Sequence, residues 1–204
     1  MEVLEDYQYF VRYEVESRLH MDSEDEGYLT KIYGSILRAE SDDDEDGVMC
    51  GHIRVSHLRC DEMTNNDDFD PRGWGKVEGD EMHEITRSMY RKNGEWVKPL
   101  EEMWGVIDPM DLLVINEIEL NKDHRGRGVG LQVVSRTIDL FGQSCGMAAL
   151  CPWPTEIDDP KNEELTRMAH RKLAKYSERL GFKNLMGTDV WVRSLVHEIS
   201  RTEN

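Results

Sequence analysis

A glycine-and-arginine turn between a strand and a helix constrains this chain more than any other stretch of its sequence. Residues 112–120 begin apolar and then alternate between apolar and polar side chains, as a partly buried β-strand does. Residues 129–141 carry apolar side chains at helical spacing. The turn between them reads Asn-Lys-Asp-His-Arg-Gly-Arg-Gly. A strand, a short turn and a helix in this order predict a helix that packs back onto a sheet.

The same turn is suited to holding an anion. Glycines let the backbone approach a ligand closely, and the first N–H groups of a helix have no carbonyl partner within it. The helix dipole and the charges of Arg125 and Arg127 add positive potential at this point. A pyrophosphate fits these features, although glycine-rich helix starts also occur without a ligand. Two common nucleotide motifs are excluded, because Gly126, Gly128 and Gly130 are not spaced G-x-G-x-x-G and no Gly-Lys-Ser or Gly-Lys-Thr is present.

The rest of the pattern predicts one domain over residues 1–204 of class α+β (α/β). Alternation predicts strands over 7–15 and 48–58, whereas 28–37 fits either a strand or a short helix. These opening strands indicate an antiparallel meander. The later elements, in chain order, are a loop over 62–76, a helix over 77–92 ended by Gly94, a strand over 147–151, a helix over 164–180 and a strand over 190–192. Residues 97–105 are ambiguous.

Two motifs resemble the GNAT superfamily of acetyl-CoA-dependent N-acetyltransferases. Arg125-x-x-Gly128-x-Gly130 matches the family's R/Q-x-x-G-x-G/A signature, and residues 174–182 are similar to its Y-E-R-L-G-F motif. The motifs stand in the family's order, and the resemblance covers residues 111–192, which would form the acetyl-CoA-binding core. The family usually places two helices after its first strand. Residues 1–110 would therefore be a differently built acceptor-side half, with acidic loops and an inserted helix.

The resemblance implies a fold and a cosubstrate site. It implies a mixed, mostly antiparallel sheet flanked by helices, with the fourth and fifth strands splayed apart. The pantetheine arm of acetyl-CoA would lie in that gap and bond backbone groups of Ile118 and Leu120. His170 stands where relatives often carry an Asn that touches the cofactor, although a histidine on a helix surface is also often merely solvated. The pyrophosphate would lie against the turn, which comprises Arg125, Gly126, Arg127, Gly128, Val129 and Gly130.

The resemblance also implies a reaction, the direct attack of an acceptor amine on the thioester. The amine must be neutral to attack, so a base must take its proton. Alternation places Glu117 and Glu119 on one face of their strand, although carboxylates near a strand end can also simply face water. Relatives that acetylate polyamines carry an acidic residue at the Glu117 position. Glu117 is therefore the first candidate for base or amine anchor and Glu119 the second, while the N–H of Ile118 would stabilise the oxyanion.

The sequence leaves open which residue donates a proton to the departing thiolate. Relatives use a tyrosine four residues before the Gly-Phe pair, and Ser177 occupies that position here, with Tyr176 one residue earlier. Neighbouring residues diverge by about 100° around a helix, so the two are not interchangeable. Either Tyr176 reaches the sulfur, or Ser177 and water substitute, or no acid is used. This departure motivates an alternative function, a non-catalytic GNAT-fold module that binds acyl-CoA.

The net charge of the chain limits the kinds of molecule that it is expected to bind. The chain holds 42 acidic and 25 basic side chains, a net charge of -17, which disfavours nucleic acid and anionic membranes as partners. Residues 1–50 alone hold 15 acidic and 4 basic side chains, concentrated in the runs 22–26 and 42–46. These runs are either solvated loops or a field that attracts a cationic substrate. The expected acceptor is thus the primary amine of a cationic small molecule or peptide.

Further expectations concern the compartment and the cysteines. The sequence shows neither an apolar run long enough to span a membrane nor a basic-then-apolar leader, which predicts a cytoplasmic protein. Cys50, Cys60, Cys145 and Cys151 lack a CxxC spacing, so we expect reduced thiols and no metal site. The resemblance also admits a homodimer, since dimers are common among relatives.

Overall fold

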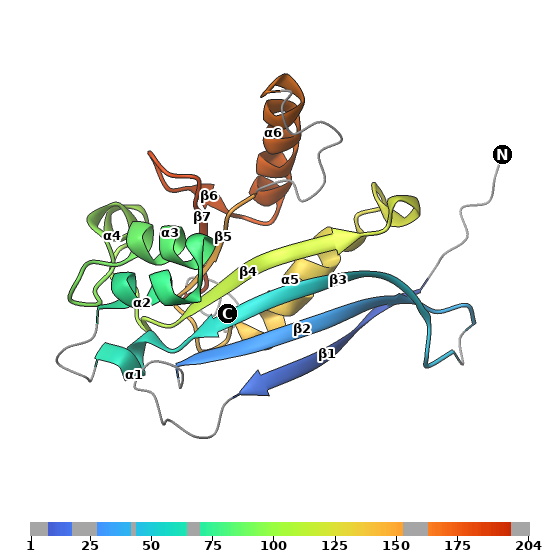
Figure 1. The fold of residues 1–204 in the computed structure, drawn as a ribbon, viewed down its shortest axis with the longest axis horizontal. Coiled ribbons are helices and arrows are strands. Elements are labelled where there is room, and N and C mark those ends of the chain that lie inside the picture. Colours follow the sequence, from blue (N-terminus) through green and yellow to red (C-terminus); the bar gives the residue numbers. More distant parts are fainter. Residues whose placement is uncertain (1–7, 18–27, 42–43, 65–69, 153–162, 197–204) are drawn as a thin grey trace, which may run out of the picture.

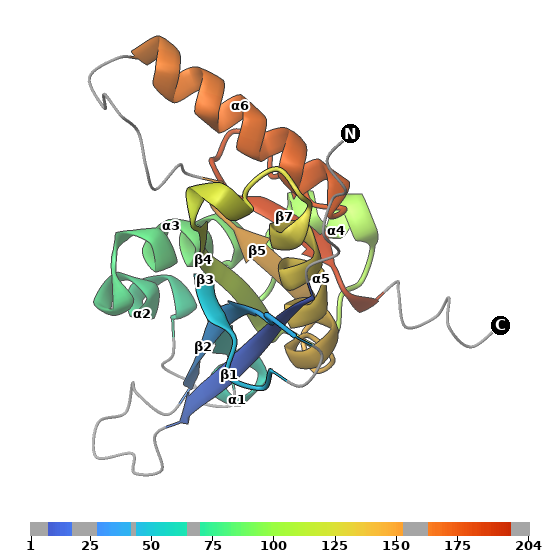
Figure 2. The same cartoon turned by 90° about the vertical axis from the view of Figure 1, so that its right-hand side faces the viewer.

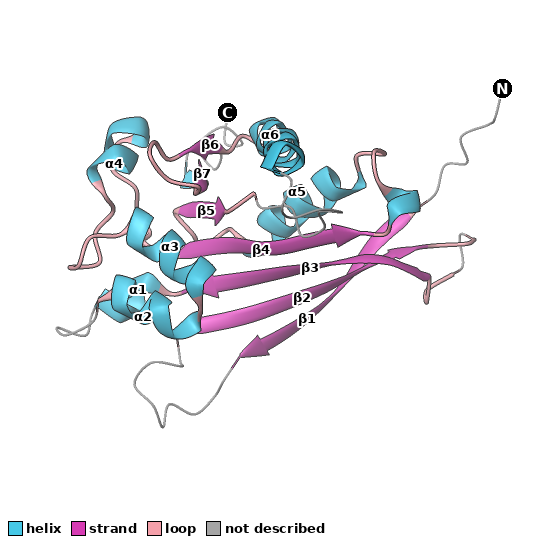
Figure 3. Ribbon diagram, turned by 45° about the horizontal axis from the view of Figure 1, so that its top comes forward, coloured by secondary structure: helices cyan, strands magenta, loops and turns pink. Residues whose placement is uncertain are grey.

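One mixed sheet organises the molecule. The computed structural model describes residues 8–17, 28–41, 44–64, 70–152 and 163–196. Within them, seven strands pair in the order β1-β2-β3-β4-β5-β7-β6, and all neighbours are antiparallel except β4 and β5, which are parallel (Figures 1 and 3). The strands are β1 Tyr9–Ser17, β2 Leu29–Arg38, β3 Val48–Leu58, β4 Leu112–Leu120, β5 Met147–Leu150, β6 Lys183–Asn184 and β7 Trp191–Ser194.

Helices cover both faces of the sheet. Four of them follow β3 and gather at one end of one face, whereas the helix after β4 lies on the opposite face (Figures 1 and 2). The helix after β5 rises beyond the β5–β7 side of the sheet. The helices are α1 Cys60–Thr64, α2 Pro71–Glu78, α3 Asp80–Met89, α4 Lys98–Trp104, α5 Val129–Phe141 and α6 Glu163–Arg179, with a short 3₁₀ helix, η1 Lys122–His124. None of the described helices is long and apolar enough to cross a membrane.

Two apolar clusters lie on the two faces, and β4 contributes to both. Leu112 and Val114 belong to the cluster beneath α3 and α4. Leu113 and Ile115 belong to the cluster beneath α5. All four side chains are buried, because β4 is covered on both sides at this end. This burial explains the continuous apolar run at the start of the strand.

Most expected elements are confirmed. Residues 28–37 form a strand rather than a short helix, because Ile32 and Ile36 point into the α5 cluster with an even spacing. The expected helices over 129–141 and 164–180 match α5 and α6 within a residue at each end. The sheet confirms the α+β class and the mixed, mostly antiparallel arrangement that the resemblance implies.

The helix expected over 77–92 is confirmed in its main part by α3, whereas the loop expected over 62–76 is wrong from Pro71 onward. A separate helix, α2, begins at Pro71, where the Asp70 carboxylate accepts the Arg72 N–H at 3.0 Å and proline suits the first turn. Gly79, with a φ of 121°, separates α2 from α3. Pro71, which indicated a loop, therefore begins a helix, and Gly73 and Gly75 lie inside that helix.

The fourth strand extends well beyond the fifth. They pair from Leu112 and Met147 to Ile115 and Leu150, after which β5 ends and β4 continues to Leu120. Within the described residues, no strand pairs with β4 on its β5 side beyond Ile115. The end of β4 that leads into the turn before α5 therefore has no described strand partner on this side.

Candidate active site

A β-bulge shapes the polar end of β4. Arg54 of β3 pairs with Glu117 but the next residue, Val55, pairs with Ile115, so Asn116 is an extra residue on β4. Plain alternation from Ile115 would point Glu117 toward α5. The bulge turns it, together with Glu119, to the opposite face of the sheet, the face that α3 covers in part.

Side-chain contacts confirm this assignment of faces. Ile118 and Leu120 pack against the α5 cluster, as their expected separation from the two glutamates requires. On the other face, the Ser56 hydroxyl donates to the Asn116 amide oxygen at 2.8 Å. Arg54 Nε donates to Glu117 Oε2 at 2.6 Å. Hence β3 and β4 present a row of paired polar side chains on the α3 face.

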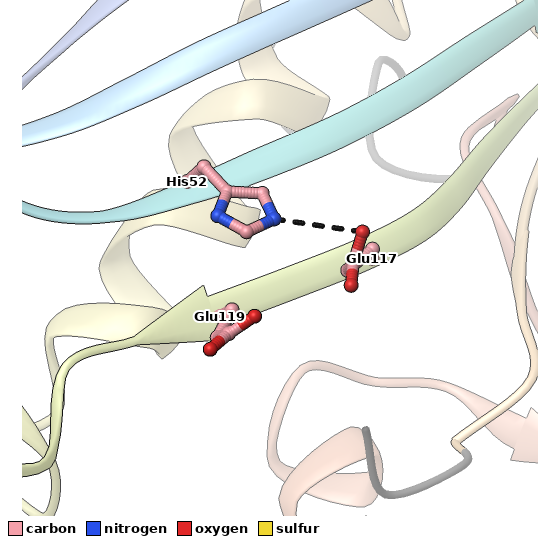
Figure 4. Close-up of side chains that lie close together, drawn as sticks. All are labelled: His52, Glu117 and Glu119. Carbon is pink, nitrogen blue, oxygen red and sulfur yellow. Dashed lines mark ion pairs between the residues drawn. The ribbon is translucent and has the colours of Figure 1, made fainter. Parts of the chain in front are cut away.

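His52 completes this row at the far end. It lies opposite Glu119 on the neighbouring strand, and its Nε2 is 3.5 Å from Glu117 Oε2 (Figure 4). The side chains of His52 and Glu117 are 43% and 19% exposed. One ligand-type atom from each of His52, Glu117 and Glu119 lies within 4.8 Å of the others. A cation bound there would compete with Arg54 for the Glu117 carboxylate.

A pocket of about 260 Å³ lies next to this row, between the start of α3 and the sheet. Glu81, on the first turn of α3, lines it and accepts a hydrogen bond from the Asn116 side chain. Burial raises the pKa of Glu81, and the bond from Asn116 and the nearby Arg54 charge oppose that rise. The pocket lining comprises Leu29, Lys31, Ile32, Tyr33, Arg54, Val55, Ser56, Gly79, Asp80, Glu81, Met82 and Asn116.

Two side-chain hydrogen bonds stabilise the turn before α5. Arg125 Nε donates to the Leu120 carbonyl at 2.6 Å, and the Tyr9 hydroxyl bonds His124 Nδ1 at 3.0 Å. Gly126 and Gly128 have φ angles of 79° and 82°, in the left-handed region that favours glycine. Nothing lies within 4 Å of the place where a side chain would begin at either glycine. The outer face of the turn is therefore accessible backbone.

Gly128 is the N-cap residue that immediately precedes α5. The first intrahelical bond observed runs from Gln132 N–H to the Gly128 carbonyl at 3.2 Å. The preceding N–H groups, those of Val129 and Gly130, have no carbonyl partner within the helix. Both residues are buried, while Arg125 and Arg127 are exposed. The predicted anion-binding residues thus come together around one helix start.

The hydroxyl groups of Tyr176 and Ser177 contact different helices. The Ser177 side chain is buried, and its hydroxyl donates to the Leu173 carbonyl one turn earlier at 3.0 Å. The Tyr176 hydroxyl instead reaches α5, where it accepts the Leu131 N–H and lies against Gly130. Burial raises the pKa of Tyr176, so the phenol keeps its proton at neutral pH. His170 is half-buried on α6.

The sequence analysis missed several residues of this site: His52, Arg54, Glu81 and Asn116. Alternation along β3 would have placed His52, Arg54 and Ser56 on one face, so a signal for two of them exists. Of the acidic runs, 22–26 lies outside the described residues. In the other run, the Asp44 carboxylate accepts the N–H groups of Glu40 and Gly47, and the bond from Gly47 lowers the pKa of Asp44.

Comparisons with known proteins add a structural likeness. No protein-family model matches the chain, and no curated protein matches it significantly. Among solved structures, the chain is similar to the crystal structure of a tyrosine-to-phenylalanine mutant of KacT, with a TM-score of 0.44 and 12% sequence identity. That match covers 84% of this chain and 75% of the other. At this level of similarity it says nothing about activity.

Proposed function

We propose that the chain is an N-acetyltransferase that transfers the acetyl group of acetyl-CoA to a primary amine of a cationic small molecule or peptide. The observation that carries this proposal is the end of β4 beyond Ile115, which no described strand covers on the β5 side and which leads into the glycine-and-arginine turn. Residues 111–192 would bind the cosubstrate. Residues 1–110, including α1 to α4, would form the acceptor side.

The backbone at this end of β4 supports binding of an extended arm. The Asn121 N–H donates to the Cys50 carbonyl on β3 at 2.7 Å, so alternation turns the peptide groups of Ile118 and Leu120 toward β5. The Leu120 carbonyl is bonded to Arg125, which leaves the Ile118 groups and the Leu120 N–H for a ligand. An amide-containing arm can add to such an edge as a further strand.

The helix start supports binding of the pyrophosphate. Accessible backbone at Gly126 and Gly128 and the N–H groups of Val129 and Gly130 form a concentrated set of donors. The exposed Arg127 adds a full positive charge at the same place. Acetyl-CoA would supply the acetyl group as a reactive thioester.

The acceptor side supports binding of a cation. Glu81, Glu117 and Glu119 lie on the α3 face, where Arg54 balances one of their charges. The remaining negative charge favours an ammonium group over a neutral or anionic acceptor. Tyr176 is the proposed proton donor, since its phenol lies at the start of α5 while the Ser177 proton is used within α6.

Titration calorimetry with acetyl-CoA, CoA and NADH tests the cosubstrate. We expect heat of binding with both CoA compounds and none with NADH. At a ligand concentration of about 100 Kd, binding should add about 2.7 kcal/mol of stability, seen as a rise in Tm. Release of the CoA thiol with a panel of polycationic and neutral amines then tests the reaction. Absence of binding to either CoA compound would refute the proposal.

The ion pair between Arg54 and Glu117 favours a second candidate, a module that binds acyl-CoA without catalysis. The carboxylate that the sequence nominates as base is already bonded at 2.6 Å. The double variant Glu117→Gln/Glu119→Gln separates the two functions. A catalyst should lose rate and keep its affinity for acetyl-CoA, whereas a binding module has no rate to lose. A matched control is Glu101→Gln/Glu102→Gln, which changes two exposed carboxylates on α4.

A further inference from the structure

We propose that His52 is the catalytic base that takes the proton of the acceptor amine, with Glu117 and Glu119 flanking its ring. This inference rests on the proposed function and assigns the proton acceptor to a residue of β3 rather than to a glutamate of β4. Three observations lead to it: the engagement of Glu117, the position of His52, and the solvent exposure of its ring.

Glu117 is poorly suited to accept a proton. Its Oε2 receives Arg54 Nε at 2.6 Å, the length of a strong charge-assisted hydrogen bond. The Arg54 side chain is 54% exposed and that of Glu117 19%, and the bond occupies one of the two carboxylate oxygens. Glu117 is therefore better suited to orient its neighbours than to act as the base.

His52 lies where a base is needed on this face. Its ring extends from β3 toward β4, and Figure 4 shows one ring nitrogen directed at Glu117, with Glu119 farther along β4. An ionised carboxylate only accepts hydrogen bonds, so in the neutral ring the nitrogen that faces Glu117 carries the hydrogen. The other ring nitrogen then holds a lone pair. Neutral imidazole is a suitable general base near physiological pH.

The groups around His52 suit a ring that gains a positive charge. On β4, the carboxylates of Glu117 and Glu119 lie near the ring. On β2, the residue opposite His52 is the uncharged Ser35, and Tyr33 is its diagonal neighbour. On β3 itself, the Arg54 charge is compensated by Glu117. Because 43% of the His52 side chain is exposed, the ring can return its proton to water.

The protons balance as follows. The bound ammonium transfers one proton to the free nitrogen of His52, and the resulting amine lone pair forms a C–N bond to the acetyl carbonyl carbon. The C–S bond breaks and its electron pair stays on sulfur. The second proton leaves the nitrogen as the amide forms and reaches the sulfur, with Tyr176 or water relaying it. The products are the N-acetyl amine, the CoA thiol and one proton that His52 releases to water.

The test is the pH dependence of kcat/KM for an amine that ionises above pH 9, in wild-type protein and in His52→Gln. With the base present, a bound ammonium reacts, so kcat/KM should level off at a pH below the pKa of the amine. In His52→Gln, only the neutral amine reacts, so kcat/KM should keep rising about tenfold per pH unit. At pH 7.5 we expect a loss of about 10²–10³-fold in His52→Gln.

Two further variants make the result decisive. His57→Gln changes another β3 histidine that lies 3.5 Å from a carboxylate, that of Asp111, and should keep the wild-type profile. Glu117→Gln should lose about tenfold and still level off with pH, because His52 remains. The inference is overturned if His52→Gln, with unchanged affinity for acetyl-CoA, keeps its rate, or if Glu117→Gln alone removes the plateau. If the wild-type protein binds acetyl-CoA but acetylates no amine, the proposed reaction fails and the inference with it.

Discussion

Arg54 sets the chemistry of the α3 face at the scale of single residues. It bonds Glu117 at 2.6 Å. Its positive charge also opposes the rise in the pKa of Glu81 that burial causes. Glu81 also accepts a bond from Asn116, yet burial outweighs both effects and raises its pKa. The face is thus acidic overall, but each carboxylate has a different partner and therefore a different chemical role.

We predict that Glu81→Gln stabilises the protein at pH 7 and not at pH 3.5. Because the pKa of Glu81 is raised on folding, the folded state binds more protons than the unfolded state between the two pKa values. Stability therefore falls as pH rises through that window, and the glutamine variant escapes this loss. Thermal unfolding at both pH values measures the difference. Glu84→Gln on the same helix is the control. An equal gain in Tm at both pH values for Glu81→Gln would contradict the prediction.

At the scale of elements, the bulge in β4 decides which residues meet. Without Asn116 as an extra residue, Glu117 and Glu119 would face α5, where the Ile118 and Leu120 side chains pack instead. The bulge therefore keeps two carboxylates out of an apolar cluster and brings them to Arg54 and His52. A local irregularity in one strand thus creates the polar row.

The start of α5 gives a prediction with a matched control. Gly128→Ala and Gly187→Ala each place an alanine at a φ near +80°, and neither new side chain would meet an atom within 4 Å. Both variants should lose about 1–2 kcal/mol of stability from backbone strain alone. Only Gly128→Ala should also weaken acetyl-CoA binding, by roughly tenfold or about 1.4 kcal/mol, because its methyl group covers the donor backbone.

Denaturant unfolding and calorimetry check the two effects separately. Equal stability losses with unequal changes in affinity would support the anion-binding turn. If both variants bind acetyl-CoA as the wild type does, the glycine-and-arginine turn is not the pyrophosphate site. That outcome would leave the backbone-strain argument intact.

At the scale of the whole molecule, the helices α1 to α4 follow β3 instead of the first strand. This insertion places α3 against the same face as the polar row and forms the pocket beside Glu81. The opposite face is closed by α5, and two apolar clusters fill the two layers. Cysteines are distributed between them, Cys60 on the α3 side and Cys50 and Cys145 on the α5 side.

We predict that these thiols react slowly in the folded protein. Burial raises the pKa of Cys145 and of Cys151 to about 12, and raises those of Cys50 and Cys60 as well. At pH 8 a thiol with a pKa of about 12 is ionised in only about one molecule in 10⁴. A thiol-specific chromogenic reagent should therefore detect little in native protein and four thiols in guanidinium. Fast reaction of a native cysteine would show that its layer opens.

The sequence alone predicted the elements whose periodicity is long and uninterrupted. The apolar run that begins β4, the glycine-and-arginine turn and the amphipathic stripes of α5 and α6 each carry a local signal, so their positions were confirmed. The parallel pairing of β4 with β5 within a mostly antiparallel sheet agrees with the resemblance of two motifs. The helix α2 was missed, because Pro71, Gly73 and Gly75 resemble a loop when read without their packing partners.

The sequence determined that Glu117 and Glu119 share a strand face, because alternation is a local property of the backbone. Only the tertiary structure decided which face that is, since the answer depends on a bulge set by pairing with β3. It also brought His52, Arg54 and Glu81 to the glutamates from other strands and from α3. Contacts between residues far apart in the chain leave no periodic signal, so the polar row became visible only when the strands were paired.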